Sequence, residues 1–157
     1  MANEIQNIII KMNAAVSDRS LLTAVNTVFG VHRARIFEQG LDANDQQIGT
    51  YSTNPMSLSK SRQARNTGRT FFKGGYAEYK TAIGKNPGYM NLRNFDQLYA
   101  DYGVISGRGS IGLGFQNPVN YAKAINIQKK QGKTIFAHNA KEIDLLTNVL
   151  AFEINRI

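Results

Sequence analysis

The chain has 157 residues, which is the size of one ordinary domain, so we predict a single folded domain over residues 1–157. Hydrophobic residues make up 42% of the chain and charged residues 19%, and this composition excludes disordered and collagen-like proteins. No apolar stretch is long enough to span a membrane, so we expect no membrane partner. Cysteine is absent, which excludes disulfides and thiolate chemistry, and the formal net charge is +8.

Two helices are predicted at the start of the chain. In residues 3–16, apolar side chains recur at spacings of three and four, which is typical of an amphipathic helix. Ser17 and Asp18 interrupt this pattern and can cap a second helix, whose apolar side chains repeat at helical spacing from Leu21 to Ile36 until Gly40 ends it. His32 lies on the apolar side of this second helix.

A polar, basic segment follows the second helix. Residues 52–90 carry seven basic side chains and one acidic side chain, a net charge of +6 that accounts for most of the excess. Residues 52–70 contain too few apolar side chains to offset the entropy of ordering, so we expect them to form a mobile arm or long loop. We call five basic side chains the basic arm: Lys60, Arg62, Arg65, Arg69 and Lys73.

Four aromatic side chains come directly after this segment: Phe71, Phe72, Tyr76 and Tyr79. Their spacing predicts a short helix that ends at Gly84. Aromatic side chains beside basic ones can stack on nucleic-acid bases, although such clusters are more often core or subunit interface. We therefore treat the four as candidates for a subunit interface.

The third quarter of the chain contains a hairpin pattern. Residues 97–106 and 110–116 are rich in Tyr, Val, Ile and Phe, and the glycines at 107 and 109 separate them. The same glycines begin a G-x-G-x-x-G match, but a strand pattern follows it where a dinucleotide site needs a helix. We interpret the match as a turn.

The remaining elements complete an α+β pattern. Residues 119–130 read as a helix and residues 134–136 as a short strand. A last helix begins at Asn139, because Glu142 stands three residues later, as in a capping box. Its predicted inner face consists of Ile143, Leu146, Leu150 and Ile154. The sequence thus predicts an antiparallel sheet with N-terminal helices, a long basic arm and a C-terminal helix.

Catalytic and metal-binding patterns are missing from the sequence. The two histidines, His32 and His138, stand far apart in the chain, and a structural role is the simplest interpretation of each. An imidazole-based zinc site would have too few ligands. No pair of acidic residues has a convincing catalytic spacing. We therefore expect no catalytic residue, no metal, no cofactor and no enzymatic activity.

The basic arm is the strongest functional signal among the residues themselves. Its side chains can neutralise phosphates and release counterions, which is how proteins bind nucleic acid without reading its sequence. The alternative is a solvated loop or a contact with an acidic protein partner. No helix-turn-helix or zinc-finger spacing is present, so sequence-specific DNA recognition is not expected.

Several short motifs resemble a family of phage virion assembly proteins, the tail-completion or head-to-tail joining proteins of the virion-morphogenesis type. The resemblance covers roughly residues 30 to 146. It is carried by Arg35-Ile36-Phe37, Ile48-Gly49-Thr50-Tyr51, Gly74-Gly75-Tyr76, Met90-Asn91-Leu92-Arg93, Ile111-Gly112-Leu113-Gly114-Phe115 and Thr134-Ile135-Phe136.

This resemblance implies a non-enzymatic α+β subunit that forms a ring around the DNA channel at the phage neck or tail. Its partners would be further copies of the chain and neighbouring portal, connector or tail proteins. Its place would be the virion, and the host cytoplasm before assembly. The basic arm would face either the genome DNA or an acidic neighbour. The alternative function is that of a small non-specific DNA-binding protein.

Overall fold

The computed structural model describes residues 18–59, 68–107 and 110–156. Their contacts form two compact units. The larger unit comprises the described residues up to Ile48 and from Asn91 onward, and the smaller unit runs from Gly49 to Met90. A segment of about 40 residues rarely folds alone without a metal or disulfide. The prediction of a single domain therefore stays a prediction.

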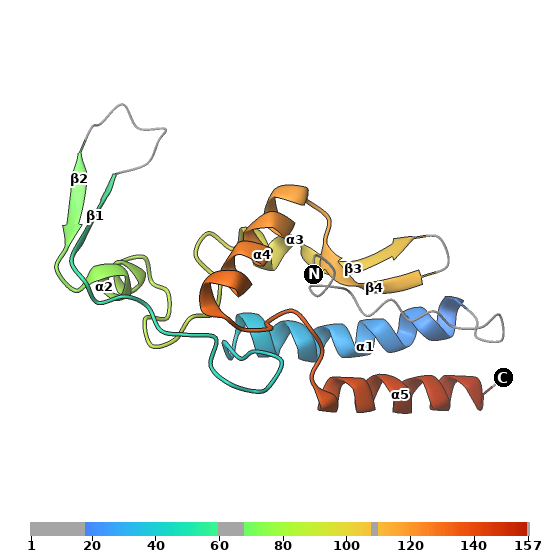
Figure 1. Ribbon diagram of the computed structural model, residues 1–157. Helices are drawn as coiled ribbons and strands as arrows, with labels where there is room; N and C mark the ends of the chain where they lie inside the picture. Colours follow the sequence, from blue (N-terminus) through green and yellow to red (C-terminus); the bar gives the residue numbers. More distant parts are fainter. Residues whose placement is uncertain (1–17, 60–67, 108–109, 157) are drawn as a thin grey trace. The chain divides into compact units, whose positions relative to one another are not determined.

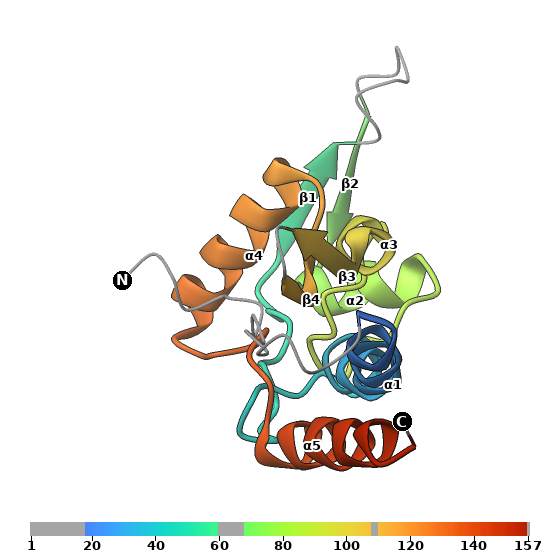
Figure 2. The same cartoon turned by 90° about the vertical axis from the view of Figure 1, so that its right-hand side faces the viewer.

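Two antiparallel helices, α1 (Asp18–Phe37) and α5 (Ala140–Ile154), lie side by side in the larger unit (Figures 1 and 2). Helix α1 confirms the second of the two helices predicted at the start of the chain. It ends at Phe37, shortly before Gly40, whose positive φ is a left-handed conformation that glycine tolerates. Both helices bury apolar side chains, including Leu21, Ala24, Val25, Val28, Leu146 and Leu150. The helix predicted over residues 3–16 lies outside the described residues.

A β-hairpin, β3 (Tyr102–Gly107) and β4 (Ser110–Phe115), packs on α1. In both views α1 lies between this hairpin and α5 (Figures 1 and 2). The predicted hairpin is confirmed, but residues 97–101 form a short helix, α3 (Gln97–Asp101), and not the start of its first strand. Asp96, which has a positive φ, precedes the first residue of this helix. The backbone N–H of Ala100 donates a hydrogen bond to the Asp96 carbonyl.

Four aromatic rings form the centre of the larger unit. Tyr102 of β3 lies 4.9 Å from Phe115 and 5.7 Å from both Phe37 and Phe136, measured between ring centroids. The rings meet at tilted or edge-on angles, which adds to the burial of their apolar surface. The end of α1, the hairpin and the chain before α5 are thereby joined in one core.

The segment before α5 differs from its prediction. Helix α4 (Pro118–Gln131) confirms the expected helix, and the Asn117 side chain caps it. The strand predicted over residues 134–136 is wrong. The backbone amides of Ile135 and Phe136 donate hydrogen bonds to the Gln128 side chain, at 2.7 and 3.0 Å. In a β-sheet such amides would donate to the backbone of a neighbouring strand.

Helix α5 begins as the sequence predicts. Asn139 and Glu142 form a complete capping box, because each side chain accepts a hydrogen bond from the other's backbone N–H. The predicted inner face is only half buried: Leu146 and Leu150 are buried, whereas Ile143 and Ile154 are exposed.

The smaller unit is a second hairpin followed by a helix. Strands β1 (Met56–Ser59) and β2 (Arg69–Phe72) pair antiparallel, and α2 (Gly75–Ala82) follows. The sequence predicted a mobile arm or long loop over residues 52–70, and the paired strands correct that prediction. Phe71 and Phe72, which were predicted to belong to a short helix ending at Gly84, lie in strand β2. Met56 pairs with Phe72, and Leu58 with Thr70, which gives the ribbon one half-buried face. Residues 60–67, between the strands, lie outside the described residues.

Candidate functional site

The β1–β2 hairpin has one exposed face that carries a cation and an aromatic ring. Side chains alternate along a strand, so Arg69 and Phe71 share one face, while Thr70 and Phe72 share the other. Phe71 is 64% exposed, which is unusual for so large an apolar side chain. A strand with an exposed Phe beside an exposed Arg offers both apolar contact and positive charge to a partner.

The structure places two members of the basic arm. Arg69 on β2 and Lys73 just after it are exposed, and neither forms an ion pair with another described residue. The other three members, Lys60, Arg62 and Arg65, belong to the segment that joins β1 to β2 and lie outside the described residues. Of the described members, Arg69 is thus the first residue of β2, and Lys73 directly follows its last residue.

The four aromatic interface candidates divide into two groups. Phe72, Tyr76 and Tyr79 contact one another, with ring centroids 5.5 Å apart for Phe72 and Tyr79 and 5.3 Å apart for Tyr76 and Tyr79. Tyr76 also lies 5.3 Å from Tyr51, and its burial raises the pKa of its phenol. These three rings take part in the packing of the smaller unit itself. Phe71, on the opposite face, is the candidate that this packing leaves exposed.

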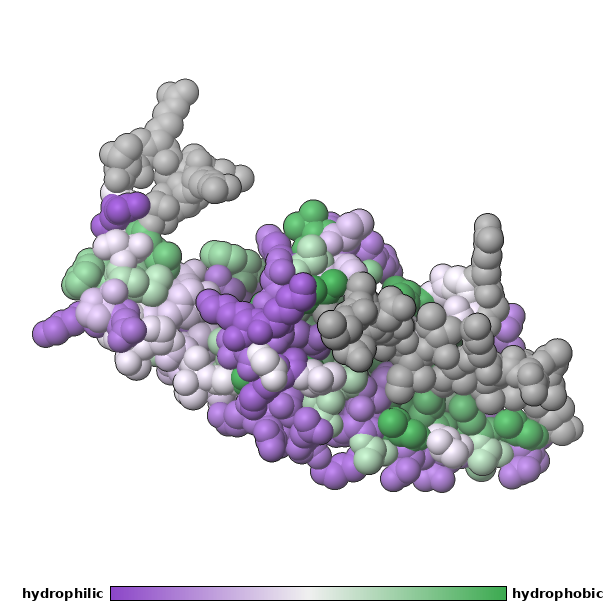
Figure 3. All heavy atoms as spheres, viewed as in Figure 1, coloured by the Kyte–Doolittle hydropathy of each residue, from purple (hydrophilic) through white to green (hydrophobic). Residues whose placement is uncertain are grey.

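Exposed apolar side chains also occur in the described part of the larger unit. Phe95 is 72% exposed, and Ile143, Phe152 and Ile154 are exposed along α5. Figure 3 shows hydrophobic residues along α5 on the visible face. None of the described helices is long and apolar enough to cross a membrane.

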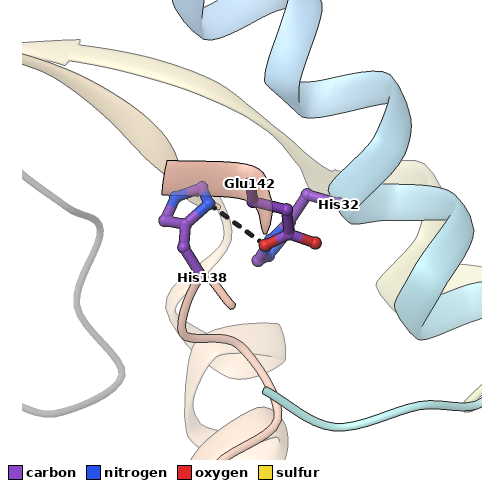
Figure 4. A group of neighbouring side chains, drawn as sticks. All are labelled: His32, His138 and Glu142. Carbon is purple, nitrogen blue, oxygen red and sulfur yellow. Dashed lines mark hydrogen bonds and ion pairs between the residues drawn. The ribbon is translucent and has the colours of Figure 1, made fainter. Parts of the chain in front are cut away.

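A buried polar cluster joins elements that are far apart in the chain. His32 and Arg35 come from α1, Tyr102 from the first position of β3, His138 from the segment before α5, and Glu142 from the first turn of α5. His32 and Glu142 are almost completely inaccessible. Figure 4 shows the imidazole rings of His32 and His138 close to the Glu142 carboxylate.

Hydrogen bonds connect this cluster in a chain. His32 Nδ1 lies 2.8 Å from Glu142 Oε2, and the Tyr102 hydroxyl lies 2.7 Å from His32 Nε2. Arg35 Nε donates to Glu142 Oε1 at 2.7 Å, and the guanidinium also donates to the carbonyls of Leu41, Ile135 and Ala137. With Glu142 ionised, His32 carries its proton on Nδ1 and accepts from the Tyr102 hydroxyl at Nε2.

Burial and these bonds shift three pKa values. Burial lowers the pKa of His32 to about 4, although the bond to Glu142 acts in the opposite direction. Burial raises the pKa of Tyr102 far above its usual value. Burial alone would raise the pKa of Glu142, but its contacts with His138, His32 and Arg35 outweigh that effect and hold the pKa well below its usual range. The cluster is thus a neutral imidazole between an ionised carboxylate and a protonated phenol.

Sequence reasoning singled out His32, His138 and Glu142 but did not predict that they lie together. It assigned a structural role to both histidines and a capping role to Glu142, yet it expected no relation between the histidines, whose ring centroids are 4.5 Å apart. The available signal was Arg35, which lies three residues after His32 on the buried side of α1. A buried arginine requires a carboxylate partner.

Comparisons of the chain with protein-family models, with curated proteins and with solved structures find no match.

Proposed function

We propose that the chain is a structural, non-enzymatic subunit of a phage neck or tail connector, which assembles into a ring around the DNA channel. The observation that carries the proposal is the exposed face of the β1–β2 hairpin. A ring subunit must present surfaces to its neighbours that its own fold does not cover, and Phe71 beside Arg69 is such a surface.

The edges of this hairpin support an assembly role. The described sheet has two strands, so each strand has one edge without a partner within that sheet. Unpaired edges pair readily with another chain, and proteins that do not assemble usually protect them. A hairpin that presents an edge, an exposed Phe and a basic connection is suited to contact a neighbouring subunit.

The charge of the smaller unit supports a position near DNA or an acidic neighbour. Seven basic side chains against one acidic side chain fall in residues 52–90. In a ring, copies of this segment would repeat around the axis, and each would add positive charge towards the channel or the next protein. This is the basis for naming genome DNA or an acidic virion protein as the partner of the basic arm.

The mass of the native assembly tests the proposal. Light scattering or native mass spectrometry on the full chain, at low and at high salt, is expected to show a closed oligomer of several copies. Apolar contacts at the hairpin would preserve this oligomer at high salt, where contacts made by charge alone are screened. The mass of a single subunit at high protein concentration would contradict a ring formed by this chain itself.

The runner-up is a small non-specific DNA-binding protein, which the same basic arm favours. This function predicts tight binding to duplex DNA of any sequence, with an affinity that falls steeply as salt rises. A connector predicts weak binding of the isolated chain at physiological salt. A titration of labelled duplex across a salt series separates the two, because tight binding with a steep slope supports the runner-up and not the connector.

A further inference from the structure

Three ligand atoms converge in the buried cluster. His32, His138 and Glu142 each offer one atom, and these atoms all lie within 4.8 Å of one another. His32 Nδ1 is 2.8 Å and His138 Nδ1 is 3.3 Å from Glu142 Oε2. Three ligands of one tetrahedral zinc ion lie about 3.4 Å from each other, given metal-ligand distances near 2.0 to 2.1 Å. The cluster needs only small side-chain shifts to reach that geometry.

His138 provides an independent indication of a ligand. Its side chain is 7% exposed, and its buried Nδ1 atom lies 3.3 Å from Glu142 Oε2 (Figure 4) but forms no hydrogen bond of good geometry with any described residue. A buried polar atom without a hydrogen bond costs about 1 to 3 kcal/mol, so native structures rarely retain one. A cation between His138 Nδ1 and the Glu142 carboxylate would give this nitrogen a partner.

The surroundings hold the His32 and Glu142 side chains as the outer sphere of a metal site does. The Tyr102 hydroxyl oxygen, 2.7 Å from His32 Nε2, can accept a hydrogen bond from a protonated Nε2, and in that tautomer Nδ1 is free to bind a metal. Arg35 Nε fixes Glu142 Oε1, and the Asn139 amide donates to Oε2 at 3.1 Å. The hydrogen-bonded ligand pair is thus already oriented.

We propose that His32, His138 and Glu142 bind one divalent transition-metal ion of the zinc class. Two imidazoles and one carboxylate are ligands that zinc prefers, whereas magnesium and calcium prefer oxygen ligands alone. Binding requires the His32 proton to move from Nδ1 to Nε2, which then donates to the Tyr102 hydroxyl. No oxidation or bond cleavage is involved.

Arg35 sets the expected strength of this site. Its Nη2 atom lies 3.3 Å from His32 Nδ1, so its positive charge opposes a cation there. Three backbone carbonyls, of Leu41, Ile135 and Ala137, already accept hydrogen bonds from the guanidinium and offset part of this repulsion. We therefore expect one site of moderate affinity.

Metal titration of the full, tag-free chain tests this proposal. After treatment with a chelator and its removal, zinc alone is added in a calorimeter, and cobalt is added in parallel for its visible absorption. The expected result is one equivalent of zinc, a rise in the unfolding temperature, and the intense visible bands of tetrahedral cobalt. The absence of saturable binding would overturn the proposal.

Two variants identify the ligands and separate ligation from folding. His138→Phe keeps a ring in place of an imidazole whose Nδ1 forms no hydrogen bond, so it is expected to fold and to lose the zinc-dependent rise in unfolding temperature. Tyr102→Phe keeps the ring packing but removes the outer-sphere hydroxyl, and it is expected to bind zinc about 10- to 100-fold more weakly. Zinc binding by His138→Phe with unchanged affinity would contradict the proposal.

Discussion

The two units of the chain differ in where several of their arginine and lysine side chains lie. In the larger unit Arg35 is buried against Glu142 and three carbonyls, and Arg33 stacks on the Tyr99 ring, with 3.6 Å between the guanidinium carbon and the ring centroid. In the smaller unit Arg69 and Lys73 are exposed. The comparison teaches that Arg33 and Arg35 of the first unit take part in the packing of the fold, whereas Arg69 and Lys73 of the second lie exposed to a partner.

The largest effect is expected where the buried ion pair of the larger unit is broken. Glu142→Gln leaves the buried Arg35 guanidinium without its counter-charge, which typically costs about 3 to 5 kcal/mol of folding free energy. The matched control is Glu153→Gln on the same helix, because Glu153 pairs at 3.6 Å with the exposed Arg156 and should cost less than about 1 kcal/mol. Denaturant unfolding measures both, and equal losses would break the comparison.

A second effect is expected on acidification of the metal-free chain. The pKa of His32 is about 4 when folded and 6.5 when unfolded, so the unfolded chain takes up a proton first as the pH falls. Stability is therefore complete above about pH 6.5 and falls by about 3 kcal/mol towards pH 4. The lowered pKa of Glu142 adds a further loss below its unfolded value of 4.5.

Denaturant midpoints measured between about pH 7 and pH 4.5 test this expectation. Arg35, Tyr102, His138 and Glu142 all face the His32 ring, so the measurement reports on the whole cluster. A stability that stays level or increases on acidification would contradict the buried neutral imidazole.

A smaller effect is expected at the turn that joins the hairpin to α2. Gly75 has a φ of +68°, and a Cβ there would lie 2.6 Å from the Ser52 carbonyl oxygen, so Gly75→Ala should destabilise the smaller unit by about 2 kcal/mol or more. Gly84 in the same unit has a φ of +69° but an open surrounding, so Gly84→Ala should cost only about 1 kcal/mol.

Amide hydrogen exchange locates these losses. Faster exchange confined to residues 68–82 after Gly75→Ala would show that the smaller unit opens by itself. If amide exchange accelerates equally around Tyr102 and Leu146, the two units unfold together and behave as one domain.

The sequence predicted the elements whose signals are local. Helix α1, the β3–β4 hairpin, α4 and the Asn139 capping box all follow from periodicity, turn residues and caps within a few positions. The strand expected at residues 134–136 failed because the Gln128 side chain replaces a strand as the partner of two amides. No local sequence pattern predicts a hydrogen bond from these backbone amides to the Gln128 side chain.

Long-range pairing explains the other failures. The β1–β2 hairpin was missed because its strands are short and a polar segment separates them, so alternation is visible over only four residues on each side. The histidine cluster was missed because its members meet only after α1, β3 and α5 pack together. Composition shows where the basic side chains lie in the chain, but only the fold distinguishes exposed Phe71 from the packed Phe72 beside it.

The most direct test of the connector account compares two exposed phenylalanines by native mass. Phe71 is 64% exposed on the hairpin and Phe95 is 72% exposed on the larger unit, so Phe71→Ser and Phe95→Ser remove similar exposed rings with little effect on folding.

We expect the unmodified chain and Phe95→Ser to form the same oligomer. The Phe71→Ser oligomer should begin to dissociate at a protein concentration about 30-fold higher than the oligomer of the unmodified chain. This corresponds to the loss of about 2 kcal/mol of binding free energy at the centre of an interface. An oligomer that Phe71→Ser leaves intact, or a single-subunit mass for the unmodified chain, would contradict an assembly made through the hairpin.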